Sequence, residues 1–133
     1  MVSSYQDKLN SLGAALERLK EVLDACVKDG NAMLRDAAIK RFEFSFELFW
    51  KVMKAYLIGQ GYDVRSPREV LQQAFAIGLL PDETVWLTML SDRNLAAHLY
   101  SELVATEIFE HIKEYYLSLK ISYETLLKAN SSF

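Results

Sequence analysis

The chain has 133 residues, of which 51% are hydrophobic and 25% charged. This length and composition are typical of one globular domain spanning residues 1–133, and they exclude a disordered chain. The 15 Lys and Arg residues against 18 Asp and Glu residues give a net charge of −3. Any nucleic-acid site must therefore be local, because there is no basic excess to cover a whole face.

Several classes of protein are excluded by what the sequence lacks. No apolar stretch approaches the roughly 18 residues that a membrane span needs, and the chain turns polar directly after Met1, unlike a signal peptide. We therefore expect a cytoplasmic protein. The single Cys26 excludes an internal disulfide and a cysteine zinc site. His98 and His111 lie far apart without a carboxylate at ligand spacing, so we expect no metal centre and no cofactor.

Helical periodicity runs through the chain in five segments. Leucines at steps of three and four from residue 9 to 23 predict a first helix. We expect this helix to end before Gly30, a residue that is able to take the left-handed conformation that often follows a helix. A second helix is predicted over residues 34–59, and a short one between Ser66 and Gly78, where Ser-Pro-x-Glu is a start signal. A fourth opens at Pro81 and a long last one at Ser101.

The predicted fold is all-α, with no strand-like alternation bounded by turn residues. We expect an antiparallel four-helix up-and-down bundle with the short extra helix, in a dimer. Aromatic residues at helical spacing, Phe42, Phe46 and Phe49, are predicted to form its core. Trp50 and Trp86 are candidate anchors of the dimer interface.

The segment from Asp92 to Tyr100 concentrates polar and titratable groups between helical flanks. In one straight helix, Arg93 and His98 would lie about 140° apart, too far to act together on one phosphate. Two explanations remain open. Either the helix breaks here, or two copies of the segment meet across a symmetry axis. A surface helix with an Arg–Asp pair and a half-buried histidine would account for the same residues without chemistry.

Four pieces of this sequence, in order over most of the chain, resemble the HEPN superfamily. They are the stretch Phe42–Lys51, the tripeptide Ser66-Pro67-Arg68, the residue Trp86, and the motif Arg93-Asn94-x-x-x-His98-x-Tyr100. Within that superfamily, the chain is most similar to the nucleotidyltransferase substrate-binding proteins and the HepT-type toxins. Arg-x-x-x-x-His alone occurs by chance, but the longer motif behind the aromatic stretch is much more specific.

The resemblance implies a helical bundle that dimerises and is encoded beside a minimal nucleotidyltransferase. In active HEPN toxins the motif residues form a metal-independent RNase site at the dimer interface. Carried over, Arg93 would stabilise the charged phosphorane, and His98 would move the proton from or to the 2′-oxygen or the leaving 5′-oxygen. Asn94 would orient the histidine or bind phosphate.

The resemblance also implies regulation at Tyr100. In HepT-type pairs the partner transfers AMP onto the motif tyrosine, so ATP and magnesium would belong to the nucleotidyltransferase and not to this chain. Glu47 and Lys51 match an auxiliary Glu-x-x-x-Lys element of some HEPN proteins. A surface ion pair one helical turn apart explains them equally well, and we favour it.

Two functions of different class stay open. The first is an RNase toxin that the partner silences, and the complete Arg-Asn-x-x-x-His-x-Tyr motif favours it. The second is a non-catalytic subunit that holds a nucleotide or substrate for the nucleotidyltransferase, and the net charge of −3 favours it.

Overall fold

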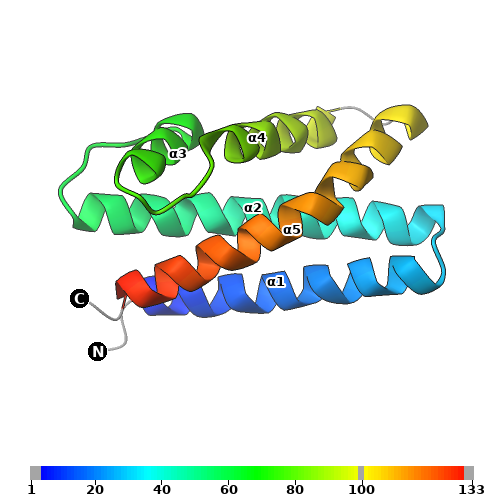
Figure 1. The fold of residues 1–133 in the computed structure, drawn as a ribbon, viewed down its shortest axis with the longest axis horizontal. Coiled ribbons are helices and arrows are strands. Elements are labelled where there is room, and N and C mark those ends of the chain that lie inside the picture. The colour runs from blue at the N-terminus through cyan, green and yellow to red at the C-terminus, as the bar shows by residue number, and fades with distance from the viewer. Residues whose placement is uncertain (1–3, 99–100, 131–133) are drawn as a thin grey trace.

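The structure is a computed structural model that describes residues 4–98 and 101–130. Those residues form five helices and no strand, which confirms the all-α class (Figure 1). The helices are α1 (Ser4–Lys28), α2 (Ala32–Gly59), α3 (Pro67–Ala76), α4 (Glu83–His98) and α5 (Glu102–Asn130). None of these helices combines the length and the apolar character that crossing a membrane would require.

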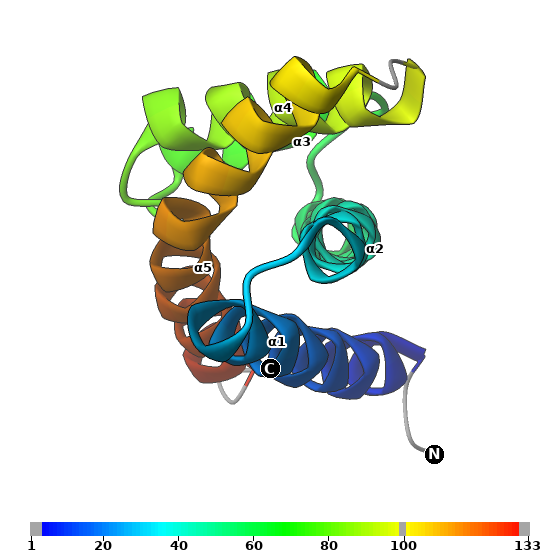
Figure 2. The ribbon, with the colours of Figure 1, turned by 90° about the vertical axis from the view of Figure 1, so that its right-hand side faces the viewer.

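Helix α2 lies at the centre of the fold and contacts each of the other four helices. Helices α1 and α4 run antiparallel to α2 on different sides of it, whereas α5 crosses obliquely and packs against α1, α2 and α4 (Figures 1 and 2). The short α3 contacts α2 and α4. This arrangement places the end of α4 and the start of α5 beside the first half of α2.

Local signals set most of the helix boundaries. The Ser66 side chain accepts a hydrogen bond from the Glu69 backbone, and Glu69 accepts one in return, so the predicted capping box of α3 is present. After α3 the chain turns at Gly78, whose φ of +84° is the left-handed conformation that glycine adopts at least cost. Helix α1 ends at Lys28, which confirms the predicted end before Gly30. The left-handed conformation expected at Gly30 is wrong, because the φ of Gly30 is not positive.

The core is aromatic where α2 meets α4. Phe42, Phe46 and Phe49 are fully buried, as predicted. Trp86 is also fully buried, with its ring centroid 4.7 Å from that of Phe49. The expectation that Trp86 anchors a dimer interface is therefore wrong, because the face of α4 that carries it is turned towards α2. Trp50 is partly buried and packs against the same core.

Candidate functional site

Arg93 and His98 lie on one uninterrupted helix, because α4 runs from Glu83 to His98 and the chain leaves it only afterwards. Their spacing of five residues on a continuous helix separates their directions by about 140°. The first of the two explanations, a helix break between them, is thus wrong. The side chain of His98 and all of Tyr100 lie outside the described residues.

Arg93 joins α4 to α2. Its guanidinium forms an ion pair and a hydrogen bond with the Glu47 carboxylate, and its Nη1 donates to Asn94 Oδ1 at 3.1 Å. Lys51 Nζ lies 3.4 Å from Glu47 Oε1. The helical Glu47–Lys51 pair therefore exists, but Glu47 also faces the motif arginine, a contact that the spacing along α2 did not predict. The structure thus brings Arg93, Asn94, Glu47 and Lys51 together.

Glu47 is held in its ionised form. Partial burial by itself would raise the pKa of the Glu47 carboxyl, but the Trp50 indole, Arg93 and Lys51 together lower the pKa below the ordinary glutamate value. The side chains of Arg93 and Glu47 are 27% and 32% exposed, so solvent reaches the pair. An incoming anion could therefore compete with Glu47 for the arginine.

An open hollow of about 300 Å³ lies beside this ion pair. Its lining comes from α2 and α4 and consists of Lys40, Glu43, Phe44, Glu47, Arg93 and Ala97. Lys40 Nζ lies 3.7 Å from Glu43 Oε2, so this cation too has a carboxylate partner. Phe44 is 60% exposed, unlike the buried phenylalanines of the same helix. The hollow thus holds two cations, Lys40 and Arg93, each paired with a glutamate, and an exposed aromatic ring next to the motif.

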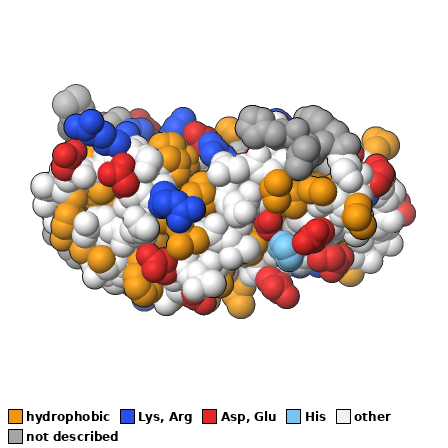
Figure 3. Space-filling model, turned by 90° about the horizontal axis from the view of Figure 1, so that it is seen from above, with side chains coloured by type: hydrophobic (Ala, Val, Ile, Leu, Met, Phe, Trp, Pro, Cys, Tyr) orange, Lys and Arg blue, Asp and Glu red, His pale blue; other side chains and the backbone are white. Residues whose placement is uncertain are grey.

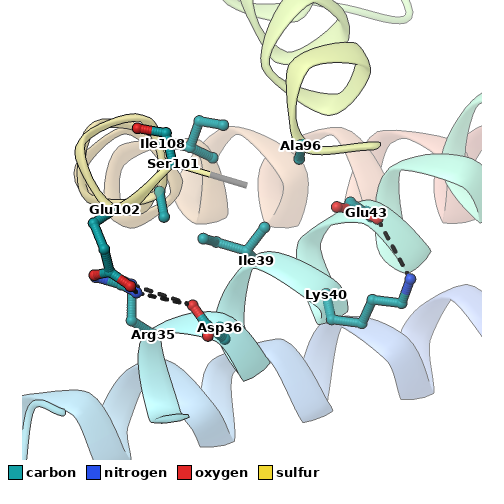
Figure 4. Close-up of a pocket in the computed structure, with 10 residues that line it drawn as sticks. Arg35, Asp36, Ile39, Lys40, Glu43, Ala96, Ser101, Glu102 and Ile108 are labelled. Atoms are coloured by element: carbon teal, nitrogen blue, oxygen red, sulfur yellow. Dashed lines mark hydrogen bonds and ion pairs between the residues drawn. The ribbon is translucent and has the colours of Figure 1, made fainter. Parts of the chain in front are cut away.

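A second, narrower cleft of about 220 Å³ lies between α2 and the junction of α4 with α5 (Figure 4). Ile39, Ala96 and Ile108 give it an apolar lining, and Arg35 bridges its rim by donating to both carboxylate oxygens of Glu102 at 2.9 and 3.2 Å. The Arg35 guanidinium lowers the pKa of the Glu102 carboxyl. This ion pair ties the start of α5 to α2.

A third polar group was missed from the sequence. Asp92 Oδ2 accepts a hydrogen bond from the Tyr115 hydroxyl at 2.7 Å and lies 2.7 Å from Nδ1 of His111. His111 therefore has a carboxylate partner, contributed by another helix and invisible as a sequence spacing. The available signal was that His111 and Tyr115 are four residues apart, on one face of α5.

Charge on the described surface is mixed. In the view of Figure 3, the Lys and Arg side chains are scattered among acidic and hydrophobic ones and form no continuous basic area. Among the side chains that the structure describes, which exclude that of His98, no three from His, Cys, Asp or Glu gather in a way that could hold a metal ion.

Comparisons with known proteins agree with this architecture. A solved structure from Thermus thermophilus is similar with a TM-score of 0.75 and 38% identity, covering 89% of this chain and 97% of that one. A Haemophilus influenzae protein, whose structure was described as revealing the fold of a substrate binding domain of a nucleotidyltransferase, is similar with a TM-score of 0.80 and 26% identity, covering 89% and 98%.

Sequence comparison points the same way. The protein named "Probable ribonuclease HepT" from Haemophilus influenzae is 26% identical over 98 residues, which are 70% of this chain and 67% of the relative. The family model described as nucleotidyltransferase substrate binding protein like matches residues 3–128. This chain, with its Arg93 motif on α4, therefore belongs to the nucleotidyltransferase substrate binding protein-like family.

Proposed function

We propose that this protein is the HEPN-type partner of a minimal nucleotidyltransferase, and that it is a metal-independent endoribonuclease toxin of the cytoplasm. The observation that carries the proposal is the solvent-accessible Arg93 at an open hollow, on the same helix as His98, in a chain of this family. The similarity to a protein named as a probable ribonuclease supports the same activity.

The chemistry assigned to the motif is cleavage of RNA by its own 2′-hydroxyl. The 2′-oxygen attacks the adjacent phosphorus, the bond from phosphorus to the 5′-oxygen breaks, and His98 relays the proton from the first oxygen to the second. Arg93 meets the charge that grows on the phosphoryl oxygens. In the free protein its hydrogen bonds to Glu47 and Asn94 hold the guanidinium at the hollow, where an incoming phosphate competes with Glu47 for its N–H groups.

The first experiment measures cleavage of a labelled RNA by the isolated protein with and without EDTA. We expect cleavage to persist in EDTA and to fall about 100-fold or more in Arg93→Ala and in His98→Ala, because each variant removes a group that acts in the transition state. Arg65→Ala, which removes an exposed arginine outside the hollow, is the matched control and keeps the activity. Loss of cleavage in EDTA that a divalent ion restores would contradict the mechanism.

The proposal includes silencing by the partner at Tyr100. The tyrosine oxygen bonds to the α-phosphorus of ATP, and pyrophosphate leaves. The added AMP is a bulky anion two residues from His98, and its phosphate attracts Arg93. Incubation with the nucleotidyltransferase and ATP should add the mass of one or more AMP groups and abolish cleavage. Tyr100→Phe should escape both effects, whereas the control Tyr62→Phe should not. An equal adduct on Tyr100→Phe would reject the assignment.

A non-catalytic nucleotide- or substrate-binding subunit is the second candidate. The pairing of Arg93 with Glu47 and the net charge of −3 favour it, because both weaken attraction for a polyanion such as RNA. Under this function, the wild-type protein binds a nucleotide in the presence of its partner but releases no RNA fragments.

A further inference from the structure

Asp92 is a buried carboxylate directly before Arg93, with only 6% of its surface exposed. A buried charge is costly unless other groups bond to it. Its partners both come from α5: the Tyr115 hydroxyl and His111 Nδ1 meet the same carboxylate oxygen, each at 2.7 Å. Asp92 therefore ties α4 to α5 at the level of the motif.

On α5, packing against α2 holds Tyr115 in place. The Tyr115 ring is buried and stacks on Phe42 of α2, with centroids 5.6 Å apart. Burial and the neighbouring Asp92 carboxylate both raise the pKa of Tyr115, so its hydroxyl keeps its proton and donates to Asp92. His111 is 38% exposed at its side chain and completes the contact from the solvent side.

Consecutive residues on a helix point about 100° apart. While Asp92 is turned towards α5, Arg93 is turned towards α2 and reaches Glu47 there. Rotation of α4 about its axis would break the contacts of Asp92 and carry Arg93 away from Glu47 at the same time.

We propose that Asp92, held by His111 and Tyr115, is a positioning residue that sets the rotation of α4 and so aims Arg93 into the hollow beside Glu47. The orientation of Arg93 is inferred only from the contacts of Asp92 and of Arg93. Its consequence for RNA cleavage rests on the function proposed above.

The test uses Glu47 as a reporter, because Arg93 lowers its pKa. In the full chain labelled with carbon-13, the Glu47 carboxyl is titrated by NMR, and Glu47→Gln identifies its signal. We expect Asp92→Ala to raise the Glu47 pKa towards the ordinary glutamate value, because the last turns of α4 are no longer tied to α5 and Arg93 withdraws. A Glu47 pKa that stays at its wild-type value in folded Asp92→Ala would overturn the proposal.

Two further variants distinguish a change in the orientation of Arg93 from a general loss of stability. Val22→Ala opens space in the core at α1, away from α4, and should leave the Glu47 pKa unchanged at a comparable loss of stability. Asp92→Asn retains an oxygen that can accept a hydrogen bond from Tyr115. Its Glu47 pKa should therefore lie between those of wild type and Asp92→Ala. If Asp92→Ala does not fold, Tyr115→Phe keeps the stacked ring, removes one donor, and should raise the Glu47 pKa by a smaller amount.

Cleavage kinetics then test the consequence for catalysis. We expect kcat to fall about 10- to 100-fold in Asp92→Ala, since small misplacements of a catalytic group have effects of that size, while Val22→Ala retains kcat. An unchanged kcat together with a shifted Glu47 pKa would overturn the link to catalysis. A wild-type protein that cleaves no RNA would overturn the proposed function, and the NMR result would still decide whether Asp92 aims Arg93.

Discussion

Glu47 is the residue on which the charges of the site converge. It faces Arg93 of α4 and Lys51 of its own helix, and the Trp50 indole together with these cations holds the pKa of its carboxyl below the ordinary glutamate value. In a free protein, this pairing neutralises the arginine. Under the proposed function, an incoming phosphate competes with the Glu47 carboxylate for Arg93, so Glu47 sets how strongly an anion must bind to displace it.

This pairing predicts how stability depends on pH. Because the folded pKa of Glu47 is lowered from 4.5, its contribution to stability is complete above pH 4.5 and is lost as the pH falls through the lowered value. Denaturant unfolding from pH 3 to pH 7 should therefore show wild type more stable than Glu47→Gln at neutral pH, with the difference shrinking as the pH falls.

The control for that experiment is Glu21→Gln, which removes an exposed carboxylate from α1 and makes the same change in net charge. The free energy of unfolding of this control should stay close to that of wild type from pH 3 to pH 7. A Glu47→Gln difference that grows as the pH falls would contradict the ionised pair.

Among the helices, α1 and α5 meet where the Tyr123 side chain packs on Gly13. A Cβ added at Gly13 would overlap the hydroxyl oxygen of Tyr123 and lie 3.0 Å from its Cζ. The sequence marks Gly13 as an exception, since glycine inside a helix costs up to about 1 kcal/mol relative to alanine. The structure supplies the reason: a Cβ at this position would displace the ring of Tyr123, which packs on Gly13 from α5.

We expect Gly13→Ala to lower the free energy of unfolding by about 1 kcal/mol, because overpacking costs about 1–3 kcal/mol and exceeds the gain in helix propensity. Gly59→Ala is the matched control, since its Cβ would meet nothing within 4 Å, and it should be neutral or stabilising. Adding Tyr123→Phe to Gly13→Ala should recover part of the loss. Chemical denaturation of the four proteins decides the matter, and a stabilised Gly13→Ala would refute the packing argument.

For the whole molecule, the continuous α4 has a consequence for assembly. Arg93 and His98 diverge by about 140° on this helix, so a site that needs both is completed by a second copy across a two-fold axis. We therefore predict a homodimer joined through α4. Light scattering at micromolar concentration should give about twice the 15.3 kDa mass of one chain.

Mixing variants tests the shared site directly. We expect Arg93→Ala and His98→Ala each to be inactive. A mixed dimer of the two would contain one site with an intact Arg93 and an intact His98 from different copies. Cleavage should therefore return when the two variants are combined and allowed to exchange subunits. A monomeric mass, or mixtures as inactive as the separate variants, would contradict the composite site.

The positions of the helices and their buried faces could be predicted because they depend on residues close together in the sequence. The five helices follow from apolar residues at helical spacing, the start of α3 from a capping box around Ser66, and the buried row of Phe42, Phe46 and Phe49 from its period. The motif around Arg93 was visible because its residues are close in sequence. The continuity of α4 through His98 was not decided there, because polar residues interrupt the apolar pattern that would reveal it.

The tertiary structure decided which of these residues meet. Whether Trp86 faces solvent or α2, whether Arg93 reaches Glu47, and whether Asp92 finds Tyr115 all depend on the rotation of α4 and the oblique crossing of α5. Spacing within a helix specifies one face relative to another, but not the neighbour that each face contacts. That choice arises from packing among helices far apart in the chain, where burial of the large side chains is balanced against the need to pair every buried charge.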